Sequence, residues 1–383
     1  MSDAGTPLPD RIEGAPHPRE TLRLIGQGAA EQGFLEAFNT GRLHHGWLIT
    51  GPRGVGKATL AWRIARFLLA TPLEDDGGLF GDAPPQPTTL DIDPEHPVAR
   101  RIMAGSDPGL FLVRRGGAGS SDRDREKNFE EGKFSQDIRV SEIRGLARFI
   151  HLSSTEGGRR VVIVDAADEM NTQAANALLK MLEEPPARTT LLLVSHQPSR
   201  LLPTIRSRCR ELRLSALSPE DMAEALAQAG VDPGADTAAL AELSGGSVGE
   251  AVRLINLGGL QIYAELVAIF QGLPRPDRAR ALKLAEAAAT RGAEDKLDLL
   301  IWLVDLFLSR LARSGAVGVP GVEAAPGEAE LFTRLAPHPQ AARAWADCAQ
   351  EVGARSRHGR AVNLDPAALV LDTVFKIQQT AAG

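Results

Sequence analysis

A glycine-rich stretch that ends in a lysine has the residue types best suited to bind phosphate. It reads Gly-Pro-Arg-Gly-Val-Gly-Lys-Ala-Thr over 51–59. Gly51, Gly54 and Gly56 leave backbone N–H groups free to curl around phosphate oxygens. Lys57 supplies a positive charge for the outer phosphates, and the helix that follows adds its dipole. Because an apolar run precedes the stretch and a helical pattern follows it, the sequence predicts a phosphate-binding loop between a strand and a helix.

A second stretch is typical of the magnesium-binding element of such proteins. Val-Val-Ile-Val-Asp at 161–165 is an apolar strand pattern that ends in a carboxylate. In phosphate-loop proteins an aspartate at this position reaches the magnesium ion of the nucleotide. The alternative is that Asp165 only caps the turn after the strand. Together with Lys57, Asp165 indicates a site for ATP or ADP with Mg²⁺.

Two side chains that catalyse hydrolysis in such proteins are absent. The residue after the lysine should carry a hydroxyl that ligates magnesium, and here it is Ala58. Thr59 follows, but one residue along a helix lies about 100° round its axis, so Thr59 does not take the same place. An acid next to Asp165 would polarise the attacking water, and here it is Ala166, with Asp168 and Glu169 further on. The sequence predicts a degenerate site that cradles phosphate without turnover.

The elements that position these residues alternate along the first half of the chain. Short apolar runs read as strands, and helical patterns lie between most of them. This alternation predicts an α/β fold with a parallel sheet covered on both faces. Beyond residue 214 the chain reads as Ala- and Leu-rich helix to its end. The predicted strands are 47–50, 111–113, 161–164, 191–194 and 212–214.

Four segments poor in apolar residues are expected to lie outside the regular helices and strands. Residues 1–19 read as a loose N-terminal arm, followed by a helical pattern at 20–40. Two insertions, near 72–97 and 114–133, are rich in Pro, Gly or charge and could not bury enough apolar area to offset their ordering entropy. A Gly/Pro-rich segment at 314–327 is expected to be a surface loop in the helical half.

Composition narrows the class of protein. Hydrophobic residues make up 43% and charged residues 24% of the 383-residue chain, which is globular usage. No apolar stretch reaches the roughly 18 to 20 residues of a membrane span, and no signal-peptide pattern opens the chain. Two cysteines are too few for a disulfide framework. A net charge of -6 excludes a protein whose whole surface binds nucleic acid. We expect a cytoplasmic protein with no membrane partner.

Two further motifs carry a resemblance to a known family. Asn-Ala-Leu-Leu-Lys-Met-Leu-Glu-Glu-Pro-Pro at 176–186 and Ser-Arg-Cys at 207–209 resemble the AAA+ ATPase core of the bacterial clamp loaders of DNA polymerase III. The resemblance is strong over about 20–213, apart from the insertions, and weak through 244–251. It implies an AAA+ type P-loop domain followed by a small helical lid and an all-α collar. The expected domains are an arm at 1–19, the AAA+ domain at 20–215, the lid at 216–258 and the collar at 259–383.

The resemblance assigns roles to individual residues. It implies that Arg208 is an arginine finger that reaches in trans into a neighbour's ATP site. From the residues alone, a basic solvated edge formed by Arg206, Arg208 and Arg210 is the favoured interpretation. In the lid, hydrolysing relatives carry a nucleotide-sensing arginine where this chain has Gly249. Cofactor binding is implied for Gly51, Gly54, Gly56, Lys57, Thr59 and Asp165 as a degenerate nucleotide site.

The resemblance also implies an assembly. It predicts a subunit of the DNA polymerase III complex, a nucleotidyltransferase, with little or no ATPase activity in the isolated chain. The implied partners are gamma/tau and delta subunits in a pentameric ring, the sliding clamp, and primed DNA reached through the complex at replication forks on the nucleoid. Relatives bear a four-cysteine zinc module at the position of 72–113, and this chain has no cysteine there. We therefore expect no zinc and no other metal site.

Two other classes of function compete with this one. An active AAA+ motor, such as a helicase loader or a branch-migration enzyme, would need the side chains missing at Ala58, Ala166 and Gly249. A direct turnover assay separates that motor from an idle ring member. A small-molecule kinase would share the phosphate loop, but it would not explain the helical second half or the motif at 207–209.

Overall fold

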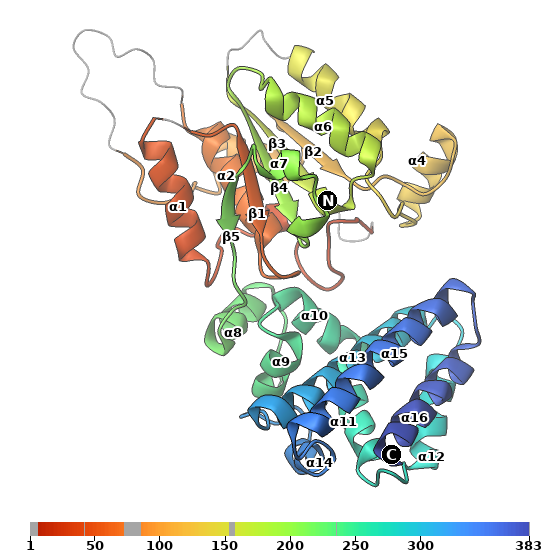
Figure 1. The fold of residues 1–383 in the computed structure, drawn as a ribbon. Coiled ribbons are helices and arrows are strands. Elements are labelled where there is room, and N and C mark those ends of the chain that lie inside the picture. Colours follow the sequence, from red (N-terminus) through yellow and green to blue (C-terminus); the bar gives the residue numbers. More distant parts are fainter. Residues whose placement is uncertain (1–6, 42, 73–85, 153–157, 235, 383) are drawn as a thin grey trace, which may run out of the picture. The chain divides into compact units, whose positions relative to one another are not determined.

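The computed structural model describes residues 7–41, 43–72, 86–152, 158–234 and 236–382 (Figure 1). The chain forms two compact units, one of residues 1–231 with 247–249, and one of 232–246 with 250–383. This division falls inside the expected lid at 216–258, because α8 (Pro219–Gln228) belongs to the first unit and α9 (Thr237–Ser244) to the second. The separation of lid from collar stays a prediction.

A five-stranded parallel sheet forms the centre of the first unit, in the order β2-β3-β4-β1-β5. The five predicted strands are all present, each within a few residues of its predicted bounds. β4 is central, and all seven of its residues are buried, as a continuous apolar run covered on both faces requires. The strands are β1 (Gly46–Thr50), β2 (Leu110–Arg114), β3 (Arg160–Asp165), β4 (Thr189–Ser195) and β5 (Arg210–Arg213).

Helices cover both faces of the sheet, so the predicted α/β fold is confirmed (Figure 1). Side chains alternate along each strand, and Val162 and Val164 of β3 join one core cluster with α5 (Val140–Leu152) and α6 (Thr172–Glu183). On the other face, α2 (Lys57–Ala70) packs against β3 and β4. The remaining helices of this unit are η1 (Pro18–Glu20), α1 (Gly28–Asn39), α3 (Pro97–Met103), α4 (Asp122–Glu130), η2 (Ala167–Glu169), η3 (Pro198–Arg200), α7 (Pro203–Arg206) and α8.

A helix boundary and an insertion of the first unit differ from expectation. The helix predicted over 20–40 begins only at Gly28, because the chain bends at Gly26, whose φ of 72° is not helical. The insertion at 114–133 is ordered: Ser121 caps α4 by accepting from the Asp124 N–H, and the rings of Phe129 and Phe134 pack 5.4 Å apart. Local aromatic packing and the helix cap stabilise this segment, and its composition alone did not reveal either contact.

The other two irregular segments have different outcomes. In the insertion at 72–97, residues 73–85 lie outside the described residues, and Asp91 beyond them pairs with Arg63 of α2 at 2.9 Å. The N-terminal arm, expected to be loose, is described from Pro7 onward, and its Asp10 and His17 side chains are buried. From Pro7 onward the arm is therefore not loose, because polar contacts tether it to the sheet domain.

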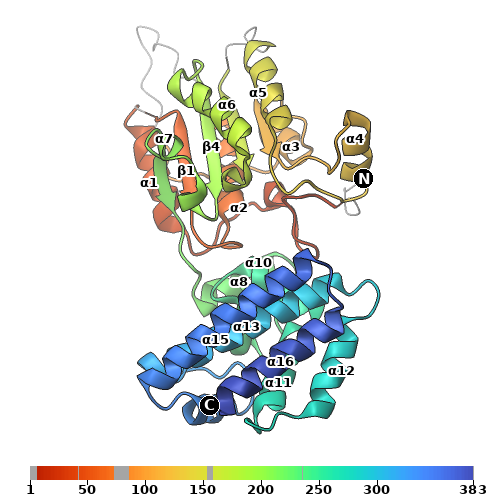
Figure 2. The same ribbon diagram turned by 45° about the vertical axis from the view of Figure 1, so that its right-hand side comes forward.

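The second unit contains helices and no strand among its described residues, as predicted (Figure 2). Phe307 lies at its centre, with its ring within 5.3 to 6.2 Å of the rings of Tyr263, Phe270 and Phe332. The surface loop predicted at 314–327 is shorter than expected, because α13 continues to Val317 with Ser314 buried, and Ala324 and Ala325 near the end of the segment are also buried. The helices are α9, α10 (Val248–Leu257, whose first two residues are grouped with the first unit), α11 (Gly259–Phe270), α12 (Arg278–Ala288), α13 (Glu294–Val317), α14 (Glu328–Leu335), α15 (Pro339–Ala361) and α16 (Pro366–Ala382).

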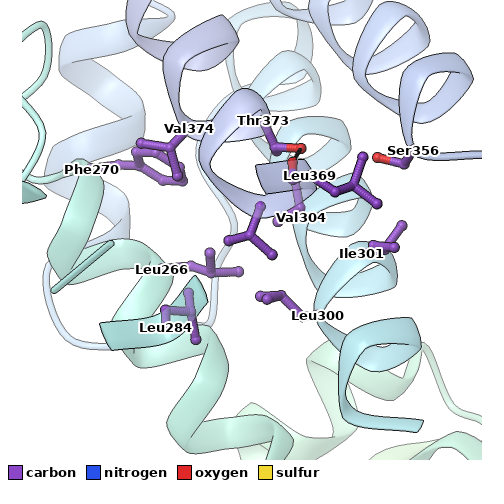
Figure 3. A pocket seen from close by; sticks show the side chains of 11 residues that line it. Leu266, Phe270, Leu284, Leu300, Ile301, Val304, Ser356, Leu369, Thr373 and Val374 are labelled. Atoms are coloured by element: carbon purple, nitrogen blue, oxygen red, sulfur yellow. Dashed lines mark hydrogen bonds between the residues drawn. The ribbon is translucent and has the colours of Figure 1, made fainter. Parts of the chain in front are cut away.

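A small apolar pocket lies inside the helical unit (Figure 3). Aliphatic side chains of α11, α12, α13 and α16 line it, and Ser356 and Thr373 are its polar members. It has no charged lining residue, so it belongs to the core packing of these helices.

Among the described residues, no single helix is long and apolar enough to cross a membrane. Of the described helices, only α10 and α11 taken together, with a bend between them, reach the length and apolar content of a membrane span.

Candidate functional site: the phosphate loop and the arginine motif

The glycine-rich loop connects β1 to α2, as predicted, and its glycines adopt conformations that other residues disfavour. Gly51, Gly54 and Gly56 have φ angles of 141°, 75° and 98°. These values lie in the left-handed region, where a Cβ would be strained. The backbone needs glycine at all three positions to turn from the strand into the helix.

Lys57 begins α2 and points back into this loop. Its Nζ donates to the Gly51 carbonyl at 2.8 Å and also to the Pro52 carbonyl. Burial lowers the pKa of Lys57 to about 8, against the charges of Asp165 and Asp168, which work to raise it. The ammonium therefore stands where a phosphate would meet it, held by the loop's own oxygens.

Asp165 ends β3 at the same edge of the sheet. Burial raises the pKa of its carboxyl to about 7, and the charges of Asp10 and Glu169 act in the same direction. Lys57 and Asp165 influence each other's pKa, so the structure brings together the two charged groups that the sequence assigned to the nucleotide. Ala58 follows Lys57 on α2, and Thr59 lies one residue further along, turned about 100° round the helix axis.

The two acids after Asp165 are both occupied by structural contacts. The Asp168 carboxylate accepts the backbone N–H groups of His196 at 2.9 Å and Gln197 at 3.2 Å. Glu169 forms an ion pair with Arg115 at 3.0 Å. Neither carboxylate replaces the acid missing at Ala166, because each is already committed to holding the loops at this edge.

Two polar residues at the end of β4 were missed by the sequence reasoning. Ser195 is fully buried, lies in register with Thr50 of β1, and its hydroxyl has no hydrogen-bond partner in the described chain. His196 follows it, and its Nδ1 also lacks a partner there. Burial and the nearby charge of Lys57 lower the pKa of His196 to about 4. Polar residues directly after the apolar run at 191–194 were the available signal.

The lid residue that replaces the expected arginine contacts the phosphate loop directly. The Gly249 N–H donates to the Gly54 carbonyl at 3.2 Å, within the same compact unit. A Cβ placed on Gly249 would lie 3.0 Å from the Gly54 Cα. Real Cβ atoms are rarely this close to backbone, so this packing suits glycine.

Arg208 lies at the opposite edge of the sheet. It follows α7 and precedes β5, whose strand runs parallel to β1, so it sits where the strands begin and Lys57 sits beyond where β1 ends. Its carbonyl oxygen lies 3.1 Å from a Cβ placed on Gly46, the first residue of β1. A strand of this length spans roughly 15 Å. Arg208 therefore does not belong to this chain's own phosphate site.

The Arg208 side chain is held in a defined but accessible position. Its two terminal nitrogens contact the Glu183 carboxylate at 3.1 Å and the Thr204 carbonyl at 3.0 Å. It keeps 37% of its surface exposed. Arg210, by contrast, lies over the Trp47 ring at 5.3 Å, so the arginines at this edge are not equivalent.

Comparison with known proteins places this chain in a family. The family model described as "DNA polymerase III, delta subunit" matches residues 26–218, half of the chain. DNA polymerase III subunit delta′ of Escherichia coli is 30% identical over 79% of this chain and 81% of its own length. Subunit delta′ of Pseudomonas aeruginosa is 36% identical over 58% of this chain and 59% of its own length. DNA polymerase III subunit gamma of a Buchnera aphidicola strain is 28% identical over 54% of this chain and 47% of its own length.

The matched region contains the phosphate loop and Asp165, and also the motifs at 176–186 and 207–209 on which the clamp-loader resemblance rests. The Pseudomonas match spans less than two thirds of that relative, whereas the Escherichia coli match extends well into the helical half. The chain belongs to the delta-prime family of DNA polymerase III clamp-loader subunits.

Proposed function

We propose that this chain is a hydrolysis-deficient ring member of the clamp loader that supplies Arg208 in trans to a neighbouring ATPase subunit. In this role it helps to load the sliding clamp onto primed DNA. The observation that carries the proposal is the placement of Arg208: an accessible guanidinium at the edge of the sheet opposite the chain's own phosphate loop. A guanidinium in that position serves a site that another chain provides.

The contacts around the phosphate loop support the lack of turnover. Ala58 offers no hydroxyl to magnesium, and Ala166 offers no acid to the attacking water. Asp168 and Glu169 are bound to other groups, and Gly249 provides no charge for an outer phosphate. Binding needs fewer groups than hydrolysis, since Lys57, Asp165 and the loop amides suffice to hold a nucleotide with Mg²⁺.

The family supplies the expected partners. We infer that gamma/tau and delta subunits complete a pentameric ring with this chain, through its helical unit, in the cytoplasm at replication forks. Primed DNA and the sliding clamp are contacted by the assembled complex. The expectation of no zinc also stays a prediction: the described residues contain no cluster of three metal-ligating side chains, while 73–85 lie outside them.

The experiment that tests this function is replacement of Arg208 by alanine in the reconstituted loader. The side chain is partly exposed and lies outside the core, so the variant should fold and assemble normally. Arginine fingers contribute about a thousandfold or more to phosphoryl transfer in well-studied systems. Because only the facing site depends on Arg208, we expect a partial loss of total DNA- and clamp-stimulated ATPase and a larger loss of clamp loading.

Matched variants make the result specific. Arg206→Ala removes an exposed arginine two residues away and should leave both activities unchanged. Arg208→Lys should behave nearly as badly as Arg208→Ala, because an ammonium does not reproduce the planar fork. Wild-type ATPase and clamp loading by an assembled Arg208→Ala complex would show that the arginines at this edge are surface charge.

A further inference from the structure

The N-terminal arm follows the carboxyl edge of the sheet. At its start, Pro7 lies against Gly132. The Asp10 carboxylate then reaches Arg114 at the end of β2, with 2.5 Å between Oδ1 and the guanidinium nitrogen. Arg114 is the register partner of Asp165 in β3. The arm thus brings a carboxylate beside the strand end that carries the magnesium-type aspartate.

The next residues of the arm lie beside the lid residue that contacts the phosphate loop. The Ile12 Cδ1 lies 2.7 Å from the place of a Cβ on Gly249, the residue whose N–H donates to Gly54. Further along, Leu24 Cδ1 lies 2.6 Å from the place of a Cβ on Gly56. Ile12 of the arm therefore lies beside the residue that hydrogen-bonds to Gly54, and Leu24, just beyond the arm, lies against the last glycine of the loop.

Buried contacts hold the arm in this path. The Asp10 side chain is 2% exposed and also bonds to His17 at 3.1 Å, and the His17 ring packs edge-on against Trp62 of α2. Two buried arginines of α2 donate to backbone carbonyls at the end of the arm and just beyond it. Arg66 donates to the Arg19 carbonyl at 2.7 Å, and Arg63 donates to the Leu22 carbonyl. Such a set of interlocked polar contacts is far stronger than a surface ion pair.

The course of the arm coincides with the place where a nucleotide would bind. Open parallel sheets bind ligands outside the carboxyl ends of their strands, and the phosphates lie on the glycine-rich loop. The arm borders both places, through Asp10 at the strand ends and Ile12 beside Gly249, and the buried negative charge of Asp10 lies near the site where nucleotide phosphates would add more negative charge. Arm and nucleotide therefore compete in space and in charge.

We propose that residues 7–20 are a built-in strap that closes the phosphate loop of this chain, and that a nucleoside triphosphate binds only when the strap is displaced. Asp10 is its latch, because one carboxylate joins the strap to Arg114 of the sheet and to His17. This inference rests on the nucleotide-site part of the proposed function and is independent of Arg208. A closed strap lowers the apparent affinity in proportion to the fraction of open molecules.

The test measures binding of a fluorescent N-methylanthraniloyl-ATP with Mg²⁺ to the isolated chain by anisotropy titration. A variant that lacks residues 1–16 should bind at least tenfold more tightly than the wild type. Asp10→Asn, which keeps the side-chain shape and removes the charge, should bind several-fold more tightly. Glu13→Gln removes the same charge from an exposed position of the arm and should bind like the wild type.

Each outcome has one meaning. Equal binding by the wild type and both strap variants would confirm a working nucleotide site and overturn the strap. No binding by any variant up to millimolar nucleotide would overturn the strap as well, and would also refute the nucleotide site itself. Circular dichroism of Asp10→Asn checks folding, so the conclusion does not depend on the truncated chain alone.

Discussion

A buried carboxylate holds together four helices of the second unit, and its removal should have a large and calculable effect. Glu328 of α14 is 0% exposed and accepts from Tyr263 of α11 and from two nitrogens of Arg310 of α13, at 2.9 and 3.0 Å. It also accepts the Ala324 N–H at 2.7 Å. Arg310 in turn donates to Glu242 of α9 at 2.6 Å.

The perturbation is Glu328→Gln, which keeps the volume and removes the charge. Removing one partner of a buried ion pair costs about 3–5 kcal/mol, because the other charge is left uncompensated in the protein interior. Glu242 still faces Arg310, so we expect the lower end, about 3 kcal/mol of unfolding free energy. With a urea dependence of about 1–3 kcal/mol per molar, the unfolding midpoint should fall by about 1 M or more.

The chain offers a matched control in the same unit. Arg355 and Asp372 form an equally bidentate pair, at 2.8 and 2.6 Å, but their side chains are 51% and 41% exposed. Asp372→Asn should therefore cost no more than about 1 kcal/mol. The assay is urea unfolding followed by tryptophan fluorescence, in which Trp302 and Trp345 report on this unit while Trp47 and Trp62 report on the first unit. Equal midpoint shifts for the two variants would refute the reasoning that burial sets the cost.

Three shorter predictions concern ATP hydrolysis, zinc content and the titration of Asp165. The isolated wild-type chain should hydrolyse ATP no faster than Lys57→Ala, and a clearly higher rate in a phosphate-release assay would contradict the idle site. Zinc in chelator-washed protein should measure well below one atom per chain by elemental analysis, and a stoichiometric amount would point to His and carboxylate ligands. Asp165 has a folded pKa near 7 against a usual 3.8, so folding favours its protonated form and stability is lost as pH rises toward 7. Asp165→Asn should therefore gain unfolding free energy over wild type, at most about 4 kcal/mol, at pH 8 and little at pH 4. A pH-independent difference in urea midpoints would show that Asp165 does not titrate in this way.

Local patterns in the sequence were sufficient for several features. The strand pattern at 161–165 and the glycine-lysine loop were both predicted, because each depends on residues that are neighbours in the sequence. The absences at Ala58, Ala166 and Gly249 needed only the sequence as well, since a missing hydroxyl, acid or guanidinium is a matter of residue type.

Tertiary structure decided the features that join distant residues. Asp10 and Arg114 are 104 positions apart, so no periodicity in the arm could show that its carboxylate is buried. Asp168 looks like a catalytic acid in the sequence and proves to bind backbone N–H groups 28 and 29 residues later. Arg208 is one of three similar arginines until the parallel order of β1 and β5 sets it at the edge opposite Lys57. Residue type fixes what a side chain can do chemically, whereas its partners and its edge of the sheet depend on long-range packing that local sequence does not encode.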